Sequence, residues 1–197
     1  MLNVMIVGVG GQGSLLASRI LGDLFIGGGL DVKLSEVHGM AQRGGPVTSH
    51  VRIGEGAYSP LIPYGNADLI LAFEPAEAVR NLIYLKKDGF IIVNSVPTKP
   101  VTESLNPTGY DGSEMIAYLK GKCDCIVIDA DALCKPFGSA KFFNIAILGV
   151  AAGSGRLGID KNTVLSEIEK RVPAKYVETN KAAFLAGAEI GERHAIN

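Results

Sequence analysis

Two hydrophobic patterns alternate along the chain. Runs of consecutive apolar residues are typical of buried strands, strict alternation is typical of half-buried strands, and apolar residues recurring every three or four positions indicate helices. The first two patterns predict strands at Leu2–Val7, Asp31–Val37, Val47–Ile53, Ala67–Phe73, Gly89–Asn94 and Cys125–Asp129. The third predicts helices at Ser14–Phe25, Pro75–Leu85, Ser113–Leu119, Phe142–Ala152, Lys161–Arg171 and Tyr176–Ile190.

This order of elements predicts an α/β fold. Alternating strands and helices are expected to form a three-layer, doubly wound, mostly parallel Rossmann-like sheet, followed by a helical C-terminal third. In the strand Asp31–Val37, the side chains of Val32, Leu34 and Val37 are expected to face inward. With 197 residues, 47% of them hydrophobic, we expect one domain over residues 1–197 with a large core.

Charge and composition narrow the possible partners. The formal net charge is -1, Trp is absent, and no long Lys/Arg block is present, so nucleic acid and anionic membrane surfaces are not expected partners. No apolar stretch is long enough to span a bilayer, and the protein is expected in the cytoplasm. The three cysteines, Cys123, Cys125 and Cys134, form no CxxC motif and are interpreted as reduced core thiols, so no metal site is expected.

The first candidate site is a glycine motif between the first strand and the first helix. Gly8, Gly10, Gly11, Gln12 and Gly13 fit the GxGxxG pattern, in which backbone N–H groups approach a phosphate at a helix N-terminus. The same glycines would also serve a turn that only packs the strand against the helix. Both interpretations stay open.

A dinucleotide site would also need an acidic ribose partner and a crossover helix after the second strand. Glu36 is the candidate for the first requirement, although a solvated carboxylate at the strand end is the more ordinary interpretation. The second requirement fails in the sequence, because the loop His38–Pro46 leads directly into another strand. An NAD site is therefore disfavoured.

The loop His38–Pro46 is the second candidate site. Its residues Gln42, Arg43, Gly44 and Gly45 combine an amide and a guanidinium with glycines, which suits carboxylate or phosphate binding or a contact between subunits. His38 could titrate near neutral pH and act as a general acid, or it could have a structural role only. Asn144, inside an apolar helix, either holds a loop in place or faces another subunit.

No nucleophile elbow, Walker loop or zinc signature is present, so no catalytic residue is assigned to this chain and it is poorly equipped as an isolated enzyme. The glycine motif, the segment from Glu36 to Gly45 and the helix around Asn144 together resemble the gamma subunit of 2-oxoacid:ferredoxin oxidoreductases (the pyruvate/ketoisovalerate oxidoreductase catalytic domain), over nearly the whole chain. Arg43-Gly44-Gly45 resembles the family at large. The residues ahead of it, from His38 to Gln42, most resemble the beta chain of indolepyruvate:ferredoxin oxidoreductase.

The resemblance implies a heteromeric enzyme. In that family, thiamine diphosphate attacks a 2-oxoacid, carbon dioxide leaves, electrons pass through iron–sulfur clusters to ferredoxin, and coenzyme A takes the acyl group. This chain has neither a thiamine diphosphate and magnesium segment nor cluster-binding CxxC runs, so these cofactors are expected on a partner chain. The glycine motif and Gln42 to Gly45 are expected near the substrate and coenzyme A entrance.

The sequence is also compatible with two other functions. One is a nucleotide-binding oxidoreductase of Rossmann type with NAD or FAD on the glycine motif. The other is a regulatory module that binds a small anion without catalysing a reaction, since a fold does not determine a function.

Overall fold

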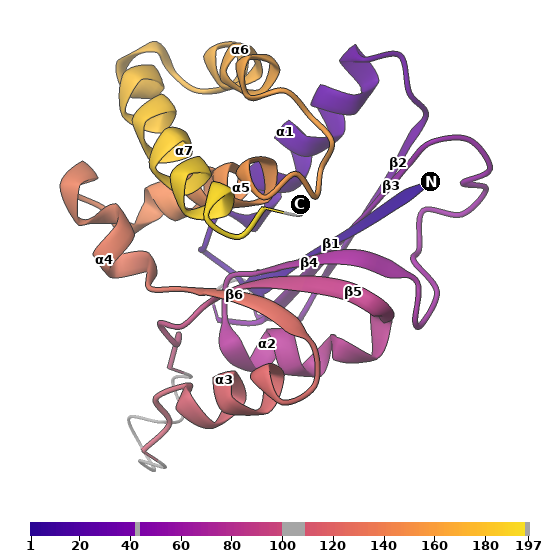
Figure 1. The fold of residues 1–197 in the computed structure, drawn as a ribbon, viewed down its shortest axis with the longest axis vertical. Coiled ribbons are helices and arrows are strands. Elements are labelled where there is room, and N and C mark those ends of the chain that lie inside the picture. Colours follow the sequence, from indigo (N-terminus) through magenta and orange to yellow (C-terminus); the bar gives the residue numbers. More distant parts are fainter. Residues whose placement is uncertain (42–43, 100–108, 196–197) are drawn as a thin grey trace.

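The computed structural model of the protein describes residues 1–41, 44–99 and 109–195. A six-stranded sheet with the order β2-β3-β1-β4-β5-β6 forms its centre (Figure 1). The strands are β1 Leu2–Val9, β2 Val32–His38, β3 Pro46–Ile53, β4 Ala67–Ala72, β5 Leu85–Asn94 and β6 Asp124–Ile128. The helices are α1 Ser14–Gly27, α2 Pro75–Arg80, α3 Ser113–Lys120, α4 Ala130–Cys134, α5 Phe143–Gly153, α6 Lys161–Arg171 and α7 Val177–Glu192.

Helices cover both faces of the sheet. Figure 1 shows α1, α5, α6 and α7 over one face, and α2 and α3 over the other. Along β1, Val4 and Ile6 join the core on the first side, and Met5 and Val7 join the core on the second. This alternation follows from the period of two in a strand that is buried on both faces. The predicted three-layer α/β architecture with a helical C-terminal third is confirmed.

Strand β3 departs from a simple doubly wound order. It lies between β2 and β1 and runs antiparallel to both, whereas β1, β4, β5 and β6 are mutually parallel. Strand β2 therefore lies at the edge of the sheet. Leu34 faces α1 as predicted, since its Cδ1 lies 3.6 Å from the position of a Cβ on Gly22, but at this edge it is still 37% exposed. The prediction that Val37 faces inward is wrong, because its side chain is 52% exposed.

The second predicted helix is shorter than expected. Helix α2 ends at Arg80, where the side chain of Asn81 donates a hydrogen bond to the carbonyl of Glu77 (2.9 Å). A 3-10 turn, Leu82–Tyr84, follows, and β5 already begins at Leu85. The sequence also missed the short helix α4.

Helices α5 and α7 pack with almost no side chain between their backbones. A Cβ on Gly149 would lie 2.0 Å from the carbonyl oxygen of Phe184, and a Cβ on Gly153 would lie 2.2 Å from that of Ala188. Glycines at these positions let two backbones approach to a distance that no other residue permits.

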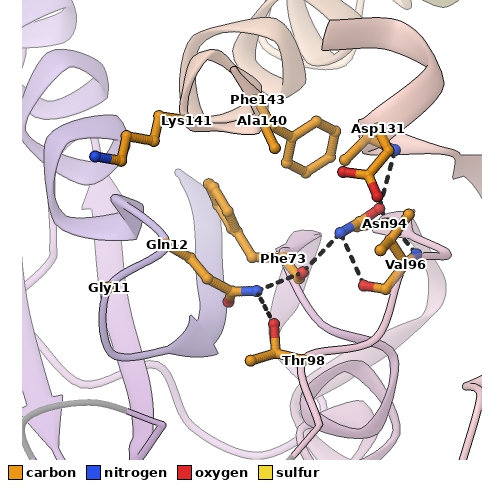
Figure 2. Close-up of a pocket in the computed structure, with 11 residues that line it drawn as sticks. Gly11, Gln12, Phe73, Asn94, Val96, Thr98, Asp131, Ala140, Lys141 and Phe143 are labelled. Carbon is orange, nitrogen blue, oxygen red and sulfur yellow. Dashed lines mark hydrogen bonds between the residues drawn. The ribbon is translucent and has the colours of Figure 1, made fainter. Parts of the chain in front are cut away.

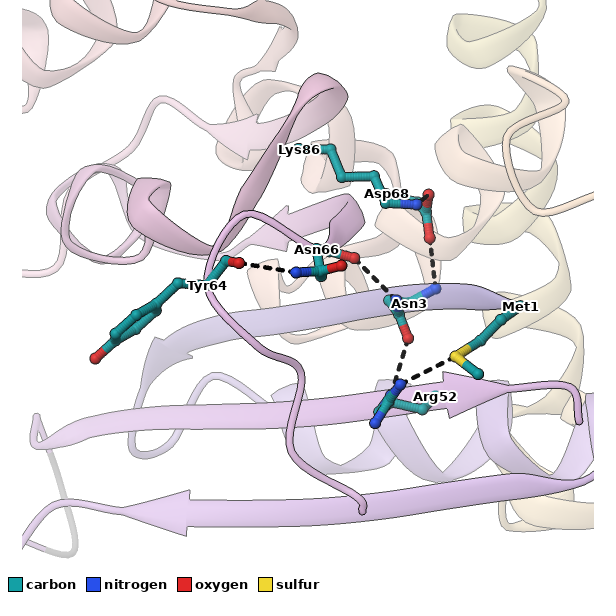
Figure 3. Close-up of polar contacts among 7 residues, drawn as sticks. All are labelled: Met1, Asn3, Arg52, Tyr64, Asn66, Asp68 and Lys86. Carbon is teal, nitrogen blue, oxygen red and sulfur yellow. Dashed lines mark hydrogen bonds and ion pairs between the residues drawn. The ribbon is translucent and has the colours of Figure 1, made fainter. Parts of the chain in front are cut away.

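A polar network fixes the end of the sheet opposite the glycine motif (Figure 3). The backbone N–H of Asn3 donates to Asp68 Oδ2 (2.7 Å), and its side chain donates to the carbonyl of Asn66 (2.9 Å). Arg52 Nε donates to Asn3 Oδ1 (3.1 Å), and Arg52 Nη1 donates to the carbonyl of Ser59 (2.8 Å). The connection between β3 and β4 is thereby tied to β1 and to β3.

Within the described ranges, no single helix is long and apolar enough to cross a membrane. The bent pair Ala130–Phe137 and Ala140–Gly153 reaches that length and composition only together.

Candidate functional site at the carboxyl ends of the strands

The candidate site lies where the chain leaves β1 and β4 in opposite directions. From β1 the chain passes through α1 toward one edge of the sheet, and from β4 it passes through α2 toward the other edge, on the opposite face (Figure 1). In open α/β sheets, ligands bind at this switch point, outside the carboxyl ends of the strands. Three adjoining cavities of about 220, 650 and 600 Å³ open here, and Gly11 lines all three.

The glycine motif forms the floor of this crevice. Gly11 and Gly13 have φ angles of 100° and 80°, in the left-handed region that favours glycine. Gly13 precedes α1, so the first free N–H groups of that helix lie beside the cavity that Ser14 also lines. The motif therefore forms a tight turn between β1 and α1, and phosphate binding by it stays a prediction.

The second glycine segment meets the first. The N–H of Gly10 donates to the carbonyl of Gly45 (2.9 Å), and the N–H of Gly44 donates to the carbonyl of Gly10 (3.3 Å). A Cβ on Gly45 would lie 2.4 Å from the carbonyl oxygen of Ala41, so the close approach of residues 41 and 45 requires glycine at position 45. Two segments predicted separately thus form one wall; Gln42 and Arg43 lie outside the described residues.

Gln12 points into the protein (Figure 2). Its Oε1 accepts a hydrogen bond from the N–H of Val9 (2.8 Å), and its Nε2 donates to the carbonyl of Phe73 (3.1 Å) and to Thr98 Oγ1 (2.9 Å). The side chain therefore connects the end of β1 with the end of β4 and with the segment after β5.

Asn94, the last residue of β5, is a site residue that the sequence analysis missed. Its Nδ2 donates to the carbonyls of Phe73 (3.1 Å) and Val96 (3.0 Å), and its Oδ1 accepts from the N–H groups of Val96 (3.0 Å) and Ala130 (3.1 Å). The available signal was a polar residue at the end of an apolar strand.

A buried acidic group faces the glycine motif across the cavity of about 600 Å³. Glu74 caps α2 by accepting from the N–H of Glu77 (3.0 Å), and it accepts a second bond from Tyr110 Oη (2.6 Å). Glu77 pairs with Arg80 (3.0 Å), and burial raises the pKa of its carboxyl. Burial, with the bond to Glu74, also raises the pKa of Tyr110. Lys99 and Arg80 supply positive charge along the same cavity.

Glu36 lies on an edge strand away from the glycine motif, whereas His38, two residues later, lines the cavity of about 650 Å³ together with Gly10, Gly11 and Gly13. Glu36 accepts a hydrogen bond from Ser18 Oγ on α1 (3.2 Å), and its Oε2 lies 3.8 Å from Nε2 of His38. Strand β3 separates Glu36 from β1, which is unlike the dinucleotide arrangement in which the second strand neighbours the first.

The buried amide of Asn144 packs on the glycine motif. Its Nδ2 lies 2.8 Å from the position that a Cβ on Gly13 would take, which agrees with a role in holding this loop.

Cys123, Cys125 and Cys134 are free thiols, and burial raises the pKa of Cys123 and Cys134 to about 11. In the part of the chain that the structure describes, no three His, Cys, Asp or Glu side chains are grouped as metal ligands.

Known proteins are similar to this chain in both sequence and fold. Residues 3–190 match the family described as Pyruvate ferredoxin/flavodoxin oxidoreductase. The "Indolepyruvate oxidoreductase subunit IorB" of Pyrococcus horikoshii is 36% identical over 95% of this chain and 94% of its own. The keto/oxoacid ferredoxin oxidoreductase gamma subunit from Geobacter sulfurreducens has a TM-score of 0.74 at 23% identity, covering 98% of this chain and 99% of its own.

A third match is a longer polypeptide. The 2-oxoglutarate:ferredoxin oxidoreductase from Magnetococcus marinus, whose structure has 2-oxoglutarate, coenzyme A and succinyl-CoA bound, has a TM-score of 0.74 at 17% identity. The match covers 98% of this chain and 31% of that one, so there the same fold is part of a larger chain. The chain therefore belongs to the pyruvate ferredoxin/flavodoxin oxidoreductase family, as a non-autonomous subunit of a 2-oxoacid:ferredoxin oxidoreductase.

Proposed function

We propose that this subunit belongs to a cytoplasmic enzyme that oxidatively decarboxylates a 2-oxoacid, with indolepyruvate as the substrate, and uses coenzyme A to form acyl-CoA, carbon dioxide and reduced ferredoxin. The substrate assignment is supported by the 36% identity to the indolepyruvate oxidoreductase subunit of Pyrococcus horikoshii. It is also supported by the segment from His38 to Gln42, which resembles the corresponding chain of that enzyme class.

Thiamine diphosphate, magnesium and the iron–sulfur clusters are assigned to a partner chain in this proposal. The donor set of this chain supports the assignment, because its cysteines occur without a CxxC motif and the described residues group no three metal-ligating side chains. The residues present do not fit these cofactors.

The crevice at the switch point is proposed to form part of the coenzyme A entrance. Its contribution comes from Gly8, Gly10, Gly11, Gln12 and Gly13, together with Gln42, Arg43, Gly44 and Gly45. The observation that carries this proposal is the hydrogen-bonded contact between Gly10 and the pair Gly44–Gly45, because it places both glycine segments around one opening. Left-handed glycines beside Lys99 and Lys141, which line two of the cavities, suit the phosphates of coenzyme A.

Arg43 gives the direct test of the coenzyme A entrance. In the complex with the thiamine diphosphate subunit, Arg43→Ala should raise the KM for coenzyme A by about tenfold or more, as expected for the loss of one charge-assisted contact. Arg43→Lys keeps the charge without the bidentate fork, so its KM for coenzyme A should lie between those of the wild type and Arg43→Ala. Unchanged steady-state kinetics in Arg43→Ala would overturn the proposed entrance.

The substrate assignment needs a separate measurement. Ferredoxin reduction by the complex should be followed with indolepyruvate, 2-oxoisovalerate, pyruvate and 2-oxoglutarate, each with coenzyme A. Indolepyruvate should give the highest kcat/KM. A higher value for any of the other three would reassign the substrate without affecting the subunit role.

A further inference from the structure

The Gln12 side chain has no donor hydrogen left for a ligand. A primary amide offers two donor hydrogens and one acceptor oxygen. Both hydrogens are used, by the carbonyl of Phe73 (3.1 Å) and by Thr98 Oγ1 (2.9 Å), and the oxygen accepts from Val9 N–H (2.8 Å). Both donor hydrogens and one of the two acceptor positions of the Gln12 amide are therefore bonded to protein, although Gln12 stands in the middle of the glycine motif.

The hydrogen bonds of Gln12 continue across the sheet (Figure 2). The Phe73 carbonyl that accepts from Gln12 also accepts from Asn94 Nδ2 (3.1 Å). Asn94 in turn accepts from the N–H of Ala130 (3.1 Å), the first residue of α4. Hydrogen bonds of these two side-chain amides thus join the carboxyl ends of β1, β4 and β5 to the start of α4.

Gly8 accommodates this arrangement. A Cβ on Gly8 would lie 2.6 Å from Gln12 Oε1 and 2.9 Å from Phe73 Cβ. The first glycine of the motif therefore makes room for the glutamine amide, in addition to any role in ligand approach.

We propose that Gln12, which lines the cavity of about 220 Å³, acts as a positioning residue: its hydrogen bonds to the protein brace Gly11 against the wall carrying Thr98 and so set the width of the coenzyme A opening. Gly11 directly precedes Gln12 in the chain and lines all three cavities, and Thr98 lines two of them. A change in the brace therefore changes the opening on both sides. The part of this inference that concerns coenzyme A rests on the proposed function.

The kinetic test compares three variants in the complex with the thiamine diphosphate subunit. Gln12→Glu keeps the shape but replaces the amide donors by a carboxylate that faces the Phe73 carbonyl. It should raise the KM for coenzyme A by about tenfold, the equivalent of one to two lost hydrogen bonds, with kcat and the KM for the 2-oxoacid nearly unchanged.

Thr98→Val removes one bond of the brace and should give a smaller rise, whereas Thr98→Ser retains the hydroxyl and should restore the original KM. A general loss of folded protein would lower kcat for all substrates and would not be rescued in this way. Wild-type kinetics in Gln12→Glu would overturn the proposal.

Hydrogen exchange on the full chain tests the brace without any enzyme assay. Val9 lies opposite Pro46 at the end of the β1–β3 ladder, and its N–H is held by Gln12 Oε1. In Gln12→Ala this amide should exchange about tenfold faster, while amides in the middle of β1 keep their protection. An unchanged Val9 rate would exclude the brace. A faster rate in a chain that supports no 2-oxoacid oxidation would retain the brace and reject the proposed function.

Discussion

Gly187 on α7 faces Ala146 on α5 so closely that a Cβ on Gly187 would lie 2.0 Å from the Ala146 carbonyl oxygen. Gly149 has the same relationship to Phe184. Gly187→Ala must therefore separate the two helices, and we expect it to lower the free energy of unfolding by about 3 kcal/mol, at the upper end of overpacking effects in well-packed cores. Urea denaturation of purified variants measures this change.

Gly27 provides a matched control for that substitution. It is the last residue of α1, and a Cβ there would have no neighbour within 4 Å. Gly27→Ala should therefore leave stability unchanged or raise it by a few tenths of a kcal/mol to about 1 kcal/mol. An equal loss in both variants would contradict the close α5–α7 contact as the cause, because Ala favours a helix more than Gly does.

Gly8→Ala should disturb the Gln12 amide specifically. The new methyl group would meet Gln12 Oε1 and Phe73 Cβ, and we expect a destabilisation of about 1–3 kcal/mol. The double variant with Gln12→Ala removes the first of these clashes, so the two substitutions should be strongly non-additive in a double-mutant cycle. Simple additivity would contradict the geometry.

His50 should make stability depend on pH. It is buried, its Nδ1 accepts from the N–H of Ile62 (3.2 Å), and its ring meets Tyr84 edge-on at 5.6 Å. Burial lowers the pKa of His50 below its ordinary value of 6.5. Below that pH the unfolded chain binds the proton and the folded chain does not. Stability should therefore fall as the pH decreases, by at most about 1.4 kcal/mol per pH unit, until the folded-state pKa is reached.

The measurement is urea denaturation at several pH values between 7.5 and 5. His50→Asn should flatten the dependence in this range. His194→Gln, a change at an exposed residue, should retain it. A wild-type slope in His50→Asn would exclude His50 as the cause.

Much of the fold could be predicted from local patterns. The apolar runs that became β1, β4 and the second half of β5 are buried on both faces, and such strands are recognisable without their neighbours. The position of β3 was not predictable, because it depends on pairing between Val47 and Gly8 and along the rest of the strand. The exposure of Leu34 depends on the same arrangement, since the alternating sequence pattern of a strand is the same whether the strand lies at the edge or in the centre of a sheet.

The candidate site, too, was predictable only in part. The glycines at 11, 13, 44 and 45 were predictable because their backbone conformations or close contacts require glycine. The orientation of the Gln12 amide and the roles of Phe73, Asn94 and Thr98 were not, because these residues are joined by hydrogen bonds between segments more than 20 residues apart in the chain. A carbonyl such as that of Phe73 leaves no sign in the side-chain sequence.

The most direct test of the account is an anaerobic assay of ferredoxin reduction in three samples: this chain alone, the thiamine diphosphate and iron–sulfur subunit alone, and the two together, each with 2-oxoacid and coenzyme A. We predict activity dependent on coenzyme A in the mixture only, with both chains in one complex on size exclusion. Full activity of the partner subunit without this chain, or no complex and no activity in the mixture, would contradict the assignment.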